Sequence, residues 1–256
     1  MTQIHGKFRW YDLMTSDCKA AEAFYRSVIG WDAKDSGMPG QTYTILSKGP
    51  VMVGGLMPLR NDAAVHGARP CWSGYIAVDD VDAYAERITA AGGAVLDAPA
   101  DIPGVLRFCV VADPQGAAFI IFHGLGGPAP EPAAPGAPGH VGWHELHAGD
   151  REGAFAFYAG LFGWTRGEAI ETPEGVYQTF ATGGAPVGGM MTRMPQMPGP
   201  FWLYYFNVPA LDAAMAAVND SGGQILHGAM QVPGGSWIAQ CLDPQGAMFA
   251  IVGPER

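Results

Sequence analysis

The stretch FRWYDLMTSDCKAAEAFYRSVIGW at residues 8–31 returns as VGWHELHAGDREGAFAFYAGLFGW at residues 141–164. Its landmarks Trp10, Asp17 and Tyr25 each have a match 133 positions later. Later landmarks repeat at offsets of 130 to 134, namely Gly54-Gly55 as Gly188-Gly189, Gly92-Gly93 as Gly222-Gly223, and DPQGA at 113–117 as DPQGA at 243–247. An almost constant offset along most of a chain indicates a tandem duplication.

The two copies are joined by a segment of unusual composition. Residues 125–139 are rich in Pro, Gly and Ala and contain one charged residue, which predicts an extended, semi-rigid connector without a core. We therefore expect one domain at 1–124, a linker at 125–139 and a second domain at 140–256. Each copy is expected to form a whole domain alone, so that residues 1–124 fold when expressed separately.

Within each copy the spacing of the apolar residues switches between a strand-like and a helix-like pattern in a fixed order. Residues 8–14 alternate as a strand, and Asp17 then precedes a helical pattern that ends at Gly30. Strand-like runs follow at about 41–47 and 50–58. The second half of the copy repeats the plan, with strands at about 73–78, 94–98, 105–112 and 117–122 and a helix at 80–91. The pattern predicts βαβββ twice per domain and an α+β fold.

Composition excludes several classes of protein. Hydrophobic residues make up 48% and charged residues 15% of the chain, which is typical of a globular protein. The net charge is −10, and the second copy has no lysine, so nucleic acid is not an expected partner. No apolar run is long enough for a membrane span or a secretory signal, and we expect a cytoplasmic protein. The four cysteines lie far apart in the sequence and no two of them form a CxxC motif. They therefore suggest neither a zinc knuckle nor a disulfide framework.

The motifs FYxxxxGW after a capped helix, AAGG at the end of the second helix and VADPQGAAFIIF near the end of copy 1 carry a family resemblance. Together with the order of four βαβββ units, they resemble the vicinal oxygen chelate superfamily, which includes glyoxalase I, bleomycin resistance proteins and extradiol dioxygenases. The resemblance covers both copies. It implies two tandem domains, each with a curved, mostly antiparallel sheet, helices on the outer face and a pocket on the inner face.

Metal-dependent members of that superfamily hold a divalent metal with four inward side chains. The resemblance places Trp10, Gly54 or Gly55, Ser73 and Ile120 at these positions in copy 1, and Trp143, Gly188 or Gly189, Leu203 and Ala250 in copy 2. None of these is an effective metal ligand. The resemblance therefore implies no metal and no cofactor in this chain.

The strand pattern places polar side chains beside these positions. Asp12 in copy 1 and Glu145 in copy 2 are equivalent, and His147 shares a strand face with Glu145 while His144 points away. A buried carboxylate can act as a general base, so Asp12, Glu145 and His147 are catalytic candidates. The alternative is that these carboxylates only hold the strand ends through a backbone N–H or an arginine.

Aromatic residues and one arginine are the candidates for ligand binding. Arg107 could anchor a ligand carboxylate, or it could be an ordinary surface arginine. The aromatic candidates lie on or beside the predicted inner strands: Trp10, Trp72, Tyr75, Trp143, Trp202, Tyr204, Tyr205 and Trp237. A small-molecule pocket is mainly apolar with a few placed polar groups, although aromatic residues are more often simply core.

Three functions fit this sequence. One is a protein that sequesters a small hydrophobic or aromatic molecule without turnover, similar to the bleomycin resistance branch of the superfamily. Another is a metal-independent lyase, isomerase or hydrolase with Asp12 or Glu145 as the base. The third is a structural role, in which Trp10 and Trp143 fill the pockets and the protein acts only through its surface. The predicted partner is a small molecule, and the chain is expected to be a monomer with an internal pseudo-dimer or a homodimer.

Overall fold

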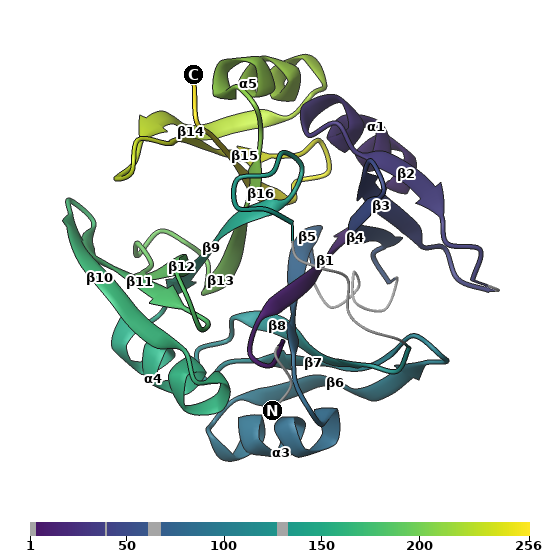
Figure 1. The fold of residues 1–256 in the computed structure, drawn as a ribbon, viewed down its shortest axis with the longest axis vertical. Coiled ribbons are helices and arrows are strands. Elements are labelled where there is room, and N and C mark those ends of the chain that lie inside the picture. The colour runs from purple at the N-terminus through teal and green to yellow at the C-terminus, as the bar shows by residue number, and fades with distance from the viewer. Residues whose placement is uncertain (1–3, 39, 61–67, 127–132) are drawn as a thin grey trace. The chain divides into compact units, whose positions relative to one another are not determined.

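The computed structural model of the chain describes residues 4–38, 40–60, 68–126 and 133–256. Its elements form four consecutive βαβββ units, as the sequence predicts (Figure 1). Copy 1 contains β1 (Phe8–Thr15), α1 (Cys18–Val28), β2 (Asp32–Asp35), β3 (Thr44–Lys48), β4 (Val51–Pro58), β5 (Cys71–Ala77), α3 (Val81–Ala90), β6 (Ala94–Ile102), β7 (Leu106–Ala112) and β8 (Ala118–Gly124). Copy 2 contains β9 (Val141–Ala148), α4 (Arg151–Phe162), β10 (Thr165–Thr172), β11 (Gly175–Ala181), β12 (Pro186–Thr192), β13 (Phe201–Asn207), α5 (Leu211–Asp220), β14 (Gln224–Gln231), β15 (Trp237–Leu242) and β16 (Met248–Gly253).

Each copy contributes one eight-stranded mixed sheet. The strand order is β2-β3-β4-β1-β5-β8-β7-β6 in copy 1 and β10-β11-β12-β9-β13-β16-β15-β14 in copy 2. Neighbouring strands of a hairpin pair antiparallel, whereas β1 with β4 and β9 with β12 pair parallel. The predicted α+β fold with two curved sheets is confirmed.

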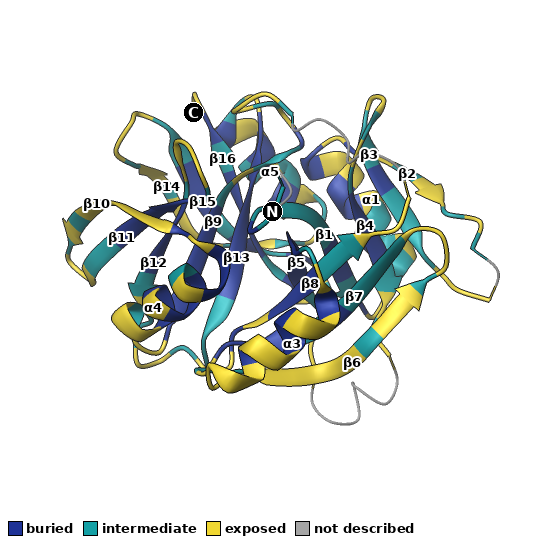
Figure 2. Ribbon diagram, turned by 60° about the horizontal axis from the view of Figure 1, so that its bottom comes forward, coloured by how far each residue is buried: buried dark blue, intermediate teal, exposed yellow. Residues whose placement is uncertain are grey.

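Two strands differ from their predicted limits. The strand β2 has the sequence DAKD, which lacks apolar alternation, and no pattern marked it. The strand β6 continues to Ile102 beyond the predicted end near residue 98, and nearly all of it is exposed (Figure 2). Both are edge strands, where one neighbour is absent and hydrophobic patterning is weak.

Among the helices of the described ranges, α1, α3 and α4 each begin after an aspartate whose side chain accepts a backbone N–H. Asp17 accepts from Ala20 N at 3.0 Å, and Asp150 accepts from Gly153 N at 2.9 Å. These bonds satisfy amide groups that the helix itself leaves unpaired. None of the helices in the described ranges has the length and apolar character needed to cross a bilayer.

The two compact units of the chain do not coincide with its two copies. One unit consists of Met1–Arg9, Ser73–Pro132 and Trp143–Trp202, and the other of Trp10–Trp72, Ala133–Gly142 and Leu203–Arg256. Each unit therefore combines half of one copy with half of the other. Within them, α3 contacts α4 and α1 contacts α5.

A buried set of polar and aromatic side chains holds the halves together in the unit that contains α1. The Tyr25 hydroxyl donates to Asp243 Oδ2 at 3.1 Å and accepts the Trp72 indole N–H at 2.9 Å. Asp243 belongs to the second DPQG turn, and its Oδ1 accepts the amides of Gln245 and Ala247. Burial raises the pKa of the Tyr25 hydroxyl well above its usual value. We call Tyr25, Trp72 and Asp243 a core triad.

The unit that contains α4 has the equivalent core triad of Tyr158, Trp202 and Asp113. The Tyr158 hydroxyl donates to Asp113 Oδ2 at 3.3 Å and accepts the Trp202 indole N–H at 3.0 Å. In both triads the tyrosine comes from one copy and the aspartate from the other. The FY and DPQG motifs thus join half of one copy to half of the other. Whether residues 1–124 fold when expressed separately stays a prediction.

Candidate functional site

The faces of β9 are distinguished by their neighbours. The strand register pairs His144 of β9 with Gly188 of β12, and Gly188 with Phe180 of β11. The Phe180 ring stacks on the ring of Trp164, which follows α4, with ring centroids 4.5 Å apart. This face carries the aromatic core of its unit, and burial lowers the pKa of His144 to about 4. Because side chains alternate along a strand, Trp143, Glu145 and His147 lie on the opposite face.

A row of polar contacts joins the side chains on that opposite face of copy 2. The Trp143 indole N–H donates to the Tyr177 hydroxyl at 2.7 Å, and that hydroxyl donates to Glu145 Oε2 at 3.0 Å. Glu145 Oε1 lies 2.8 Å from His147 Nε2, in an ion-pair contact rather than a regular hydrogen bond. Glu145 is 7% exposed and His147 is 3% exposed. We call Trp143, Glu145, His147 and Tyr177 the copy 2 floor cluster.

The equivalent residues of copy 1 form a more closed arrangement. Asp12 Oδ1 accepts the Trp10 indole N–H at 2.9 Å and the Tyr43 hydroxyl at 2.8 Å, and the indole N–H also reaches the Tyr43 oxygen at 2.8 Å. Burial, with the neighbouring Asp12 charge, raises the pKa of the Tyr43 hydroxyl. Met14 occupies the position of His147. We call Trp10, Asp12 and Tyr43 the copy 1 floor cluster.

Glycine makes room for the tyrosine in each floor cluster. The register pairs Asp12 with Gly55 and Glu145 with Gly189, which puts both glycines on the floor side of the sheet. A Cβ at Gly55 would collide with the Tyr43 hydroxyl, and a Cβ at Gly189 would collide with the Tyr177 ring. Of the alternatives left open by the sequence, Gly55 and Gly189 are therefore the floor positions, while Gly54 and Gly188 face the other side.

These residues do not fit the divalent metal of the superfamily. The first ligand position is Trp10 or Trp143, whose indole offers only an N–H donor. The second position is a glycine, and the space that a ligand side chain would occupy there holds a tyrosine ring. In the described part of the chain, no three His, Cys, Asp or Glu side chains gather as a metal-binding group.

Trp72 and Trp202 are placed differently from their predicted role. Both belong to the core triads, both are 5% exposed, and both indole N–H groups donate to a buried tyrosine. Their burial and bonding are those of core residues, so we do not include them in the proposed site. The sequence placed them on the right strands but did not show which strand face they occupy.

The tyrosines of β5 and β13 follow the same alternation. Tyr204 lies two positions from Trp202 and its ring contacts Tyr11 at 5.2 Å, on the side of β13 that carries Trp202. Its neighbour Tyr205 matches Tyr75 of copy 1 and accepts a bond from Gln240 Nε2 at 3.0 Å. Tyr75 is buried, with its ring 5.9 Å from that of Phe122. Tyr205 rather than Tyr204 therefore corresponds to the predicted inward position.

Arg107 is the second residue of β7 and Trp237 the first residue of β15, and each has a charged partner near the surface. The Arg107 guanidinium contacts Asp82 at 2.7 Å and Asp101 at 2.8 Å, and these two acidic groups raise the pKa of Arg107. Its role as a ligand anchor remains a prediction, and a ligand carboxylate would have to compete with both aspartates. The Trp237 ring is half-buried and lies 5.3 Å from the guanidinium carbon of Arg256.

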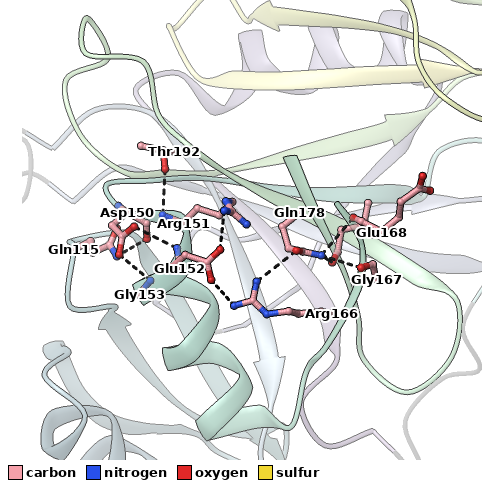
Figure 3. Close-up of polar contacts among 11 residues, drawn as sticks. Gln115, Asp150, Arg151, Glu152, Gly153, Arg166, Gly167, Glu168, Gln178 and Thr192 are labelled. Carbon is pink, nitrogen blue, oxygen red and sulfur yellow. Dashed lines mark hydrogen bonds and ion pairs between the residues drawn. The ribbon is translucent and has the colours of Figure 1, made fainter. Parts of the chain in front are cut away.

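The charged groups at the start of α4 form a separate network (Figure 3). Arg166 and Arg151 each lie 2.6 Å from one carboxylate oxygen of Glu152, and Arg166 also donates to Gln178 at 3.4 Å. The bond from Arg166 holds the pKa of Glu152 below its usual value. Both arginines are thus engaged by Glu152, and the network fixes the beginning of the helix.

Sequence reasoning missed one residue of the copy 1 floor cluster, Tyr43, and two residues of the copy 2 site, Tyr177 and Phe201. Tyr43 and Tyr177 are separated by the same offset of 134 as Gly55 and Gly189, so the repeat comparison contained a signal for them. Phe201 stacks on the His147 imidazole, with ring centroids 4.7 Å apart and planes 11° apart. Its match in copy 1 is Cys71, and no sequence signal distinguished it.

Comparison with known proteins supports the architecture. The family profile described as "Glyoxalase/Bleomycin resistance protein/Dioxygenase superfamily" matches residues 7–121 and 138–251. A Mycobacterium bovis protein named "Putative glyoxylase CFP32" is 33% identical, over 97% of this chain and 95% of its own length. "Anthracycline biosynthesis protein DnrV" of Streptomyces peucetius is 32% identical, over 96% of this chain and 93% of its own length.

Solved structures share the fold at low identity. The Mn(II)-bound glyoxalase from Novosphingobium aromaticivorans aligns with a TM-score of 0.68 and 16% identity, covering 98% of this chain and 82% of that one. The 2,2',3-trihydroxybiphenyl 1,2-dioxygenase from Sphingomonas wittichii aligns with a TM-score of 0.65 and 14% identity, covering 99% and 91%. The duplicated βαβββ units, the matched profile and these relatives agree: the chain belongs to the glyoxalase/bleomycin resistance protein/dioxygenase superfamily.

Proposed function

We propose that the chain binds a small planar aromatic molecule at the copy 2 floor cluster. The observation that carries this proposal is the row from Trp143 through Tyr177 and Glu145 to His147. Its hydrogen-bonding groups lie beside rings that are only half-buried, those of Trp143, Tyr177 and Phe201. Flat apolar surfaces with a few fixed polar groups are the usual composition of a small-molecule site.

Two features support the choice of an aromatic ligand. Half-buried aromatic rings offer faces on which another ring can stack, and such contacts contribute beyond the area that they bury. In addition, the relative from Streptomyces peucetius is named as a protein of anthracycline biosynthesis, and anthracyclines contain fused planar rings. The Glu145 carboxylate would accept a hydrogen bond from a hydroxyl or amine substituent of such a ligand.

Tryptophan fluorescence tests this proposal with a matched pair of variants. We expect 2-hydroxyanthraquinone to quench the fluorescence of the wild-type chain in a saturable titration. Trp143→Ala should weaken binding by about 1–3 kcal/mol, because it removes one wall of the site. Trp10→Ala removes the equivalent ring of copy 1 and should leave the affinity unchanged. Equal effects of the two substitutions, or saturable quenching in neither protein, would contradict a site in copy 2.

The contact between Glu145 and His147 favours a second candidate, a metal-independent lyase, isomerase or hydrolase. A buried carboxylate beside an imidazole is an arrangement that can move a proton. Copy 1 has the carboxylate Asp12 but no histidine, and the oxygen Oδ1 of Asp12 already accepts two bonds. If the chain turns over a substrate, Glu145→Gln should retain binding and abolish turnover. Turnover that persists in this variant would exclude Glu145 as an essential base.

A further inference from the structure

His147 contains a polar atom that the described structure leaves unsatisfied. The side chain is 3% exposed, and neither ring nitrogen makes a hydrogen bond: Nε2 has only its ion-pair contact with Glu145, and Nδ1 is enclosed without a hydrogen-bond partner. A buried polar atom without a partner costs free energy comparable to a lost hydrogen bond, so native proteins seldom leave one unexplained. A ligand group that pairs with Nδ1 would remove that cost.

The neighbours of His147 define the state of this atom. The negatively charged oxygen of Glu145 lies 2.8 Å from Nε2, and this charge favours the tautomer whose ring proton is on Nε2, although the contact lacks hydrogen-bond geometry. Nδ1 then carries a lone pair and can accept a proton. The other carboxylate oxygen accepts the Tyr177 hydroxyl at 3.0 Å, which orients Glu145. Glu145 is in this sense a positioning residue for His147.

Phe201 covers the imidazole and indicates the shape of what reaches it. The two rings are stacked at 4.7 Å with an angle of 11°, and Phe201 itself is only half-buried at the first residue of β13. The half-buried Phe201 ring is therefore the side chain that a ligand must displace or stack against to reach His147. A ligand that pairs with Nδ1 must bring its hydroxyl to the edge of the imidazole, because the Nδ1 lone pair lies in the plane of that ring.

We propose that His147 accepts the proton of a ring hydroxyl of the ligand, so that copy 2 binds planar hydroxyaromatic compounds as their phenolates. This inference rests on the proposed function. In the step, the ligand O–H bond breaks and its electron pair stays on oxygen, while an N–H bond forms at Nδ1. The resulting imidazolium is paired with the Glu145 carboxylate on one side and with the phenolate on the other, so no charge is left alone in the buried site. No oxidant or further reactant is needed.

Copy 1 supplies the matched control for this step. Met14 stands at the position of His147, and a thioether does not accept a proton at neutral pH. His147→Met therefore gives copy 2 the residue that copy 1 already carries on the same strand face. The substitution changes the proton acceptor and leaves Trp143, Tyr177 and Glu145 in place.

The experiment uses 2-hydroxyanthraquinone, whose visible absorption band moves to longer wavelength when its hydroxyl ionises. Binding is followed by tryptophan quenching, and ionisation by the visible spectrum of the same samples over a range of pH. We expect the ionisation midpoint of the bound probe to fall by about one pH unit or more below that of the free probe. His147→Met should bind the probe and abolish this shift, and Glu145→Gln should reduce it. Far-UV circular dichroism confirms that each variant is folded.

The outcomes separate the two proposals. Binding with no shift, or a shift that survives in folded His147→Met, overturns the proton transfer and leaves the binding site intact. If His147→Met fails to fold, Glu145→Gln provides the test. An ionisation midpoint of the bound probe that is shifted as far in Glu145→Gln as in the wild-type chain would overturn the proposed role of Glu145 and His147 in the proton transfer. Absence of saturable binding in the wild-type chain overturns the proposed function, and the inference with it.

Discussion

The two core triads are nearly identical, whereas the two floor clusters have diverged. In both triads a tyrosine hydroxyl donates to an aspartate and accepts an indole N–H, at 3.1 and 2.9 Å for Tyr25 and at 3.3 and 3.0 Å for Tyr158. In the floor clusters, Trp10 donates to both Asp12 and Tyr43, while Trp143 donates to Tyr177. The same duplication therefore retained one set of contacts and altered the other.

The physical reason lies in what each set must do. Every polar atom of a core triad is buried in its unit, so a change in one member leaves its partners without hydrogen bonds. The floor clusters are bordered by half-buried rings and tolerate a change of one side chain. The added methylene group of Glu145 relative to Asp12 extends the carboxylate, and a histidine at position 147 gives that carboxylate a second partner. Copy 2 thereby gains a proton acceptor that copy 1 lacks.

Separating the copies should produce the largest effect. Tyr25 of copy 1 bonds to Asp243 of copy 2, and Trp31 donates to the linker carbonyl of Gly139 at 2.7 Å. Residues 1–124 alone would lose these partners and expose the apolar face of α1, so we expect aggregation or a non-cooperative thermal transition. The measurement is differential scanning calorimetry of residues 1–124 and 140–256, alone and mixed. A cooperative transition of residues 1–124 alone, at the temperature of the full chain, would restore the independent-domain hypothesis.

Removing the indole of a core triad should have the next largest effect. Trp202→Ala and Trp72→Ala each create a cavity and remove the N–H that the central tyrosine accepts, and we expect each to destabilise the fold by about 3–5 kcal/mol. The two losses should be similar, because the two triads are equivalent. Urea unfolding measures both. A loss below about 1 kcal/mol together with weaker ligand binding would instead return these tryptophans to the binding site.

Much of the fold was predictable because the repeat exposes it. Asp17, Tyr25 and the DPQG turn each perform a local or core role that forces the same residue at the same place in both copies. The strand β2 was not predictable, since four mostly charged residues at a sheet edge carry no periodic signal. The sequence also did not predict that each compact unit combines half of one copy with half of the other. A sequence pattern indicates that Tyr25 is buried, but not which aspartate its hydroxyl contacts.

The site was predictable only in part for a related reason. Strand alternation placed Asp12 on the inner face of its strand in copy 1, and Glu145 and His147 on the inner face of the equivalent strand in copy 2. The structure brings Glu145 and His147 into contact. The aromatic candidates included both Tyr204 and Tyr205, and the structure assigns the inward position to Tyr205. The tyrosines of the floor clusters come from different strands, and their contacts depend on the absence of a side chain at Gly55 and Gly189. Such complementarity between distant positions has no periodicity.

Removing the floor tyrosine hydroxyls should distinguish the two copies. Tyr177→Phe takes away the acceptor of the Trp143 N–H and a donor to Glu145, whereas in Tyr43→Phe the Trp10 N–H still reaches Asp12 at 2.9 Å. We therefore expect Tyr177→Phe to cost about 1–2 kcal/mol of stability and Tyr43→Phe to cost about half as much. Urea unfolding of both variants gives the comparison. The reverse order of the two losses would mean that copy 1, not copy 2, depends on its tyrosine.

The smallest effect concerns the aspartates of the core triads. Burial raises the pKa of Asp113 and of Asp243, although backbone N–H groups and the tyrosine hydroxyl act in the opposite direction. The folded state then holds the proton more tightly than the unfolded state, whose carboxyl titrates near its ordinary value of about 3.9. Stability contributed in this way is complete below that value and decreases as pH rises through the raised folded value.

Asparagine at either position keeps the Oδ1 acceptor of the turn and removes the titration. The free energy of unfolding of the wild-type chain should decrease more between about pH 3.5 and pH 7 than that of Asp113→Asn or Asp243→Asn. The difference between the two decreases should be on the order of 1 kcal/mol for each variant. Urea unfolding across this range, expressed as the difference from wild type, cancels the contribution of exposed carboxylates such as Glu152, whose lowered pKa acts with the opposite sign. Because the triads are equivalent, the two differences should coincide. A difference that grows in favour of the wild-type chain with rising pH would show that the hydrogen bonds, and not burial, dominate these carboxyl groups.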